Sequence, residues 1–179
     1  MNRLHLHSKR ARLSPSLGEK FAEASHPFVT GSFPKDACCN CLYEGCAGLS
    51  KLRVLLADDN TQVLDYVREL LAANGCEVIG TATDGQSAVD AAAQLMPDIL
   101  VLDISMPILN GIRAARRVLE DNRSIKILFL TAHRDPETCR AALETGASCY
   151  VLKPRLASDL IPAIKFATEG RQFMSPGCE

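Results

Sequence analysis

Short apolar runs alternate with helix-like segments five times between Arg53 and Gly170, and this alternation restricts the chain to few folds. The apolar runs that we predict to be strands cover residues 53–57, 77–82, 99–102, 125–130 and 150–152. Each is followed by apolar residues three or four positions apart, which is the spacing of one helical face. Strands that alternate with helices form a parallel sheet with helices on both faces. The sequence therefore predicts a doubly wound α/β domain.

Capping residues delimit several of the predicted helices. Asn60 is a candidate N-cap for the first helix, and Asn74-Gly75 is expected to end it. Asp135-Pro136 has the pattern of a helix start, with proline at the first helical position. We expect Ser158 to begin the fifth helix, which would place Pro162 near its first turn, where a missing N–H costs least.

The first fifty residues differ in character from the rest. No helical or strand period runs through residues 1–50, and serine, proline, histidine and glycine interrupt them. We predict a poorly ordered N-terminal arm, or an upstream region translated from a misplaced start. The folded domain is then expected to cover residues 51–170, followed by a linker-like tail at residues 171–179.

The eight cysteines and the overall composition narrow the functional classes. Without a secretory leader, we expect free thiols in a reducing cytoplasm. The cluster of Cys38, Cys39, Cys41 and Cys46 leaves open a zinc or iron–sulfur site, with His26 as a further candidate ligand, although its spacing is not that of a recognised finger. The net charge of −1, the absence of tryptophan and the 5% aromatic content disfavour a nucleic-acid binder. No apolar run approaches the roughly 18 residues of a membrane span.

Polar residues follow four of the five predicted strands. Asp58 and Asp59 end the first, Asp103 the third, Thr131 the fourth and Lys153 the fifth. The carboxyl ends of parallel strands lie at one edge of the sheet, where ligands bind in such folds. Three clustered acids repel one another unless a hard cation such as Mg²⁺ neutralises them. The sequence therefore predicts a Mg²⁺ pocket that accommodates a phosphoryl group.

Four segments carry a resemblance to a known family. They are VLLADDN at residues 54–60, DISMPILNG at 103–111, LTA at 130–132 and GASCYVLKP at 146–154. In their order and spacing, residues 51–170 resemble the receiver domain of two-component response regulators, a CheY-like domain. This resemblance implies a flavodoxin-like (βα)5 fold with strand order 2-1-3-4-5 and a cytoplasmic phosphoprotein.

The resemblance also implies roles at the pocket. Asp103 is expected to be the phosphoacceptor, attacking the phosphorus of a phosphohistidine to form an acyl phosphate. Lys153 and Thr131 would contact the phosphoryl oxygens. Mg²⁺ would be held by Asp58, through water, and by Asp59, Asp103 and the backbone carbonyl of Ser105.

The resemblance implies further roles besides metal binding and phosphoryl contact. Thr131 and Tyr150 would form the conformational switch, with Tyr150 rotating inward after phosphorylation. Pro154 is expected to follow a cis peptide bond. The side chains two positions after Asp103 and Thr131, which are Ser105 and His133 here, tune the acyl-phosphate lifetime in this family.

The implied function is signalling and not enzymatic turnover, because the domain would catalyse only its own phosphorylation and dephosphorylation. The implied partners are a sensor histidine kinase or phosphotransfer protein, and a downstream protein or a second copy of the chain. Residues 167–176 resemble the linker that precedes a LuxR-type helix-turn-helix, so a truncated DNA-binding regulator is the alternative, although we expect no direct DNA binding. A haloacid-dehalogenase-type phosphohydrolase is a weaker rival, because it needs an acid where Ser105 stands.

Overall fold

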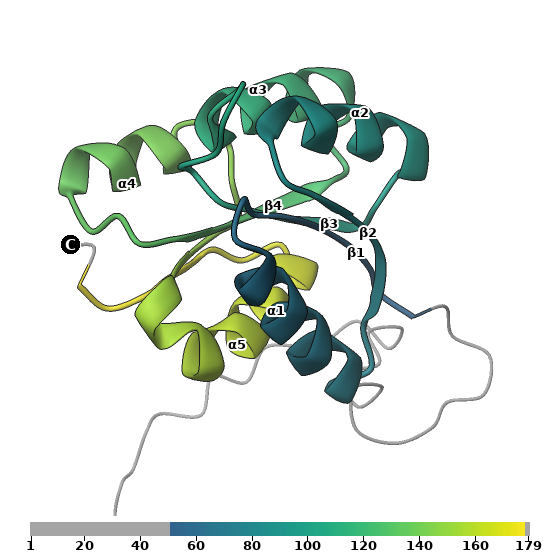
Figure 1. The fold of residues 1–179 in the computed structure, drawn as a ribbon. Coiled ribbons are helices and arrows are strands. Elements are labelled where there is room, and N and C mark those ends of the chain that lie inside the picture. The colour runs from purple at the N-terminus through teal and green to yellow at the C-terminus, as the bar shows by residue number, and fades with distance from the viewer. Residues whose placement is uncertain (1–50, 178–179) are drawn as a thin grey trace, which may run out of the picture. The chain divides into compact units, whose positions relative to one another are not determined.

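The computed structural model describes residues 51–177. The predicted arm at residues 1–50, including its cysteine cluster, lies outside the described residues. A parallel sheet runs through the centre of the described part, in the order β2-β1-β3-β4-β5-β6 (Figure 1). Its strands are β1 Arg53–Ala57, β2 Glu77–Ala82, β3 Ile99–Leu102, β4 Lys126–Thr131, β5 Cys149–Leu152 and β6 Phe173–Met174.

Five helices cover the two faces of this sheet. They are α1 Thr61–Ala73, α2 Gly85–Leu95, α3 Gly111–Asp121, α4 Pro136–Leu143 and α5 Leu156–Thr168. Helices α1 and α5 lie on one face and α2, α3 and α4 on the other (Figure 1), and each set packs on its own apolar core. Successive side chains of a strand point to opposite faces of the sheet, so in β3 Leu100 packs in one core and Val101 in the other. None of the described helices is long and apolar enough to span a membrane.

The capping residues act largely as the sequence predicted. The side chain of Asn60 accepts a hydrogen bond from the Gln62 amide at the start of α1. Asp135 accepts one from the Thr138 amide, and Pro136 occupies the first turn of α4. These contacts satisfy amides that the first turn of a helix leaves without partners.

Three local expectations about the end of the chain need correction. Helix α5 begins at Leu156 and not at Ser158, so Pro162 lies inside the helix and not in its first turn. No cis peptide bond occurs between residues 51 and 177, so the expected cis bond before Pro154 was wrong. The chain turns there through a short 3₁₀ helix, η1, at Lys153–Arg155. The predicted order of the first five strands is confirmed, and Phe173–Met174 adds a sixth strand beside β5.

Candidate functional site

Three carboxylates meet at the carboxyl edge of the sheet. Asp58 and Asp59 follow β1, and Asp103 follows the adjacent strand β3. The amide of Asp103 donates to the carbonyl of Ala57 at 2.8 Å, which continues the pairing of the two strands up to the acids. One oxygen from each carboxylate lies within 4.8 Å of the others. The geometry therefore brings together the three acids that the sequence predicted to cluster.

Lys153 reaches this cluster from η1, directly after β5. Its Nζ lies 2.8 Å from Oδ2 of Asp58 and 3.3 Å from Oδ2 of Asp103. The side chains of both acids are only 4% exposed, and that of Lys153 is 23% exposed. One ammonium group therefore bridges two buried carboxylates, while Asp59 is exposed and makes no ion pair within residues 51–177.

Burial and charge act in opposite directions on these groups. Burial raises the pKa of Asp58 above its ordinary value, although Lys153 and the Asn60 amide favour the ionised form. Burial alone would lower the pKa of Lys153, but the carboxylates of Asp58 and Asp103 outweigh it and leave the pKa raised. The lysine thus stays protonated as the cation of the site.

The donor set fits a magnesium ion. Mg²⁺ prefers oxygen ligands and commonly takes one or two carboxylates together with water. Oδ2 of Asp58 is buried and has no well-aligned hydrogen bond. Among the described residues, only the ammonium group of Lys153 offsets the negative charge of this oxygen. A divalent cation between Asp58, Asp59 and Asp103 would supply the positive charge that one lysine cannot give three acids.

Thr131, Ser105 and His133 line the same edge. Thr131 ends β4, next to β3, and is fully buried, and its Oγ1 accepts a hydrogen bond from the His133 amide at 3.2 Å. The Oγ of Ser105 lies 2.6 Å from Nε2 of His133. The resemblance singled out Ser105 and His133 as positions that tune the acyl-phosphate lifetime, but the sequence could not show that these side chains bond to each other.

Tyr150 lies away from the acids, inside the domain. Its side chain is fully buried, and its ring centroid lies 6.4 Å from that of Phe129. Its hydroxyl donates to the backbone carbonyl of His133 at 2.9 Å. The tyrosine is therefore already turned inward in this structure, where it connects β5 to the loop after Thr131, and the inward rotation expected after phosphorylation would start from this position.

Gly111 begins α3 and lies close to Asp103. Its amide donates to the carbonyl of Ile104 at 2.9 Å, so α3 begins directly against the loop that follows Asp103. A Cβ at this position would collide with the backbone carbonyl oxygen of Asp103. Only glycine permits this close approach, so Gly111 helps to position the carboxylate.

Comparison with known proteins supports this arrangement. Residues 54–165 match the family model described as the response regulator receiver domain. The chain is 33% identical over 128 residues to the transcriptional regulatory protein DegU of Brevibacillus brevis, covering 71% of this chain and 54% of that protein. It is 39% identical over 115 residues to the transcriptional regulatory protein PdtaR of Mycobacterium tuberculosis, covering 64% of this chain and 56% of that protein.

Solved structures show the same fold. A LuxR-family two-component response regulator from Aurantimonas superposes with a TM-score of 0.68 at 33% identity, covering 72% of this chain and 93% of that one. The signal receiver domain of the putative regulator NarL from Mycobacterium tuberculosis gives a TM-score of 0.65 at 28% identity, covering 69% of this chain and 100% of that one. The chain spans about half the length of the curated relatives it matches.

Proposed function

Because the chain belongs to the response regulator receiver family, we propose that it accepts a phosphoryl group from a phosphohistidine onto Asp103. The observation that carries this proposal is the buried Asp103 carboxylate, 3.3 Å from Lys153 Nζ and clustered with Asp58 and Asp59. A carboxylate held beside a cation and a metal site is suited to attack phosphorus. The new bond joins Asp103 to phosphorus as the bond from phosphorus to imidazole nitrogen breaks.

Different residues of the site would bind the metal and contact the phosphoryl group during this transfer. Asp58, Asp59 and Asp103, together with the carbonyl of Ser105, would hold Mg²⁺. When bound, the metal neutralises charge on the phosphoryl oxygens during transfer. Lys153 exchanges its contact with Asp103 for one with a phosphoryl oxygen, and the Thr131 hydroxyl donates to another.

The contact between Ser105 and His133 supports a role in the lifetime of the acyl phosphate. The two side chains join the loops after Asp103 and Thr131 at 2.6 Å. A bridge between these loops limits the access of water to the phosphoryl group. We assign to this pair the control of dephosphorylation.

The switch in this proposal is formed by Thr131 and Tyr150. A phosphoryl group on Asp103 adds charge and acceptor oxygens that attract the Thr131 hydroxyl. The His133 backbone bonds to both switch residues, since its amide donates to Thr131 and its carbonyl accepts from Tyr150. A movement of Thr131 therefore reaches Tyr150 and changes the surface formed by α4, β5 and α5.

We further propose that the donor is a sensor histidine kinase or phosphotransfer protein, and that the signal passes to a downstream protein or a second copy of the chain. Residues 51–179 carry 14 basic and 17 acidic residues, which disfavours contact with a nucleic-acid backbone by this part of the chain. Three buried free thiols, Cys76, Cys139 and Cys149, support a reducing cytoplasmic location.

Acetyl phosphate, a small phosphodonor, provides the test. With Mg²⁺, wild-type protein should gain one phosphoryl group in intact-protein mass spectrometry, and removal of Mg²⁺ with a chelator should prevent the gain. Asp103→Asn should gain none. Undiminished labelling of Asp103→Asn would reject Asp103 as the acceptor, and labelling that survives chelation would reject the metal site.

A further inference from the structure

The segment after α5 is built into the domain. Residues 171–177, which we name the strap, include strand β6. The amide of Phe173 donates to Ser148 at 3.2 Å, and the amide of Ser175 donates to the carbonyl of Tyr150 at 2.9 Å. The strap therefore covers the edge of β5, the strand that carries one of the proposed switch residues.

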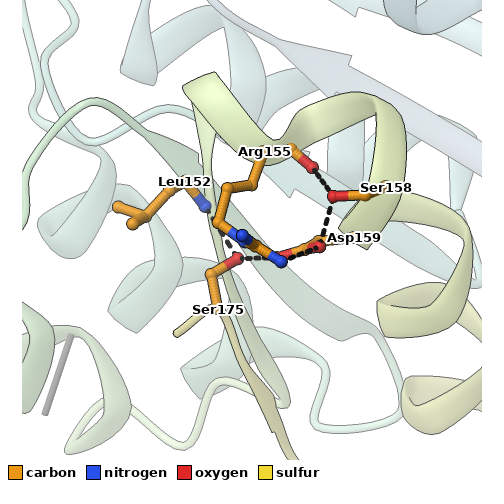
Figure 2. A network of polar contacts seen from close by, with 5 residues as sticks. All are labelled: Leu152, Arg155, Ser158, Asp159 and Ser175. Carbon is orange, nitrogen blue, oxygen red and sulfur yellow. Dashed lines mark hydrogen bonds and ion pairs between the residues drawn. The ribbon is translucent and has the colours of Figure 1, made fainter. Parts of the chain in front are cut away.

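A buried polar network fastens the strap at Ser175 (Figure 2). Ser175 is 1% exposed. Its Oγ accepts a hydrogen bond from the Leu152 amide at 3.2 Å and donates to Oδ2 of Asp159 at 2.7 Å. Because the hydroxyl group uses both its donor and its acceptor, loss of either partner leaves a buried polar group unsatisfied. We name the contacts of Ser175 with Asp159 and Leu152 the latch.

Helix α5 and η1 hold the acid of the latch in place. Arg155 forms two hydrogen bonds with the Asp159 carboxylate, at 2.7 and 3.1 Å, and Ser158 donates to it at 2.6 Å. These partners, Arg155 first, lower the pKa of Asp159 to about 2. The carboxylate is thus ionised and fixed where Ser175 meets it.

Aromatic contacts hold the other end of the strap. The ring of Phe173 packs edge-on against that of Phe166 on α5, with centroids 5.6 Å apart. The guanidinium group of Arg171 lies 4.0 Å from the centroid of the same Phe166 ring. The strap is therefore attached at two separate points.

Leu152 of the latch, and Arg155, which holds Asp159, lie close in the chain to the proposed phosphorylation machinery. Leu152, whose amide bonds to Ser175, immediately precedes Lys153, which pairs with Asp58 and Asp103. Arg155 belongs to the same 3₁₀ turn as Lys153. Leu152 and Arg155 both bond to groups of the latch, so a displacement of this turn has a direct route to the contacts of Ser175.

We propose that the strap is a conformational element released by phosphorylation. This inference rests on the proposed function: when Lys153 moves to a phosphoryl oxygen on Asp103, the turn that it begins shifts and the latch at Ser175 opens. The released strap uncovers the edge of β5 beside Tyr150. By reciprocity, opening the latch strengthens binding of a phosphoryl group at Asp103 by the same factor.

Amide hydrogen exchange on the full chain with Mg²⁺, with and without beryllofluoride as the phosphoryl mimic, tests the release. The reporters are the amides of Leu152, Phe173 and Ser175, whose hydrogen bonds tie the strap to β5. We expect their exchange to accelerate about five- to a hundredfold with beryllofluoride, the range of a typical allosteric coupling. Bound beryllofluoride with unchanged exchange would overturn the strap proposal alone. Failure of beryllofluoride to bind would overturn the proposed function and the strap release with it.

Two matched variants distinguish the effect of the latch from an effect of changed overall stability. Ser175→Ala should accelerate the same amides without beryllofluoride and tighten beryllofluoride binding about fivefold or more. Ser158→Ala removes another hydroxyl from the Asp159 carboxylate but leaves both Arg155 bonds and every strap contact in place, and should do neither. Equal effects of the two variants, or no effect of Ser175→Ala, would refute the latch.

Discussion

The substitution Asp59→Asn should stabilise the domain in the absence of Mg²⁺. Asp59 has a carboxylate oxygen within 4.8 Å of oxygens from Asp58 and Asp103, and among residues 51–177 Lys153 forms ion pairs only with those two. At 4.8 Å, an effective dielectric constant of about 20 gives a repulsion of about 3.5 kcal/mol for one pair of charges. Because Asp59 is exposed, solvent screening reduces the net effect to about 1 kcal/mol. We therefore expect the melting temperature to rise by about 4 °C.

The same substitution should remove the response to Mg²⁺. A ligand that binds only the folded state, and whose free concentration is 100 times its Kd, stabilises a protein by about 2.7 kcal/mol. Thermal unfolding followed by circular dichroism, with and without Mg²⁺, should show such a gain for the wild type and little for Asp59→Asn. Asp65→Asn is the matched control, because Asp65 lies on α1 with a side chain that is 71% exposed.

Stability measurements on Asp59→Asn can contradict both expectations. If Asp59→Asn is less stable than the wild type without Mg²⁺, repulsion among the three carboxylates does not destabilise the folded domain as their distances indicate. If the variant keeps the full Mg²⁺ stabilisation, Asp59 is not a ligand. An equal loss of the Mg²⁺ response in Asp65→Asn would point to a general charge effect.

Two further substitutions test the close packing at the site and the latch. Gly111→Ala should destabilise the domain by about 2–3 kcal/mol in urea unfolding, because the new Cβ collides with the carbonyl of Asp103, and an unchanged midpoint would contradict this. Asp159→Asn should cost about 1–2 kcal/mol at neutral pH, since the pKa of Asp159 is lowered to about 2 in the folded state. That difference should persist above pH 4 and shrink as the pH falls towards 2, so urea midpoints that converge already at pH 6 would refute it.

Local signals made much of the fold predictable. Asn60 and Asp135 cap their helices through side-chain hydrogen bonds that depend on residues two or three positions away. The acids after β1 and β3 could be placed together because parallel strands end at one edge of a sheet. The helix caps depend only on short segments of sequence, and the clustering of the acids depends only on the parallel arrangement of the strands.

Contacts between distant segments were not predictable in the same way. Strand β6 has only two residues, too few to show a period, and depends on pairing with β5. The bonds from Ser175 to Asp159 and from Ser105 to His133 join residues 16 and 28 positions apart. Helix α5 begins at Leu156, before the serine that suggested a cap, because the 3₁₀ turn at Lys153–Arg155 leads directly into it.

The most direct test of the central claim is to trap the acyl phosphate. Protein treated with acetyl phosphate and Mg²⁺ is reduced with borohydride, which converts a phosphorylated aspartate to homoserine, and then digested for peptide mass spectrometry. The proposed mechanism predicts homoserine at position 103 and at no other aspartate, and none when Mg²⁺ is chelated. Homoserine at position 58 or 59, with residue 103 still aspartate, would contradict it.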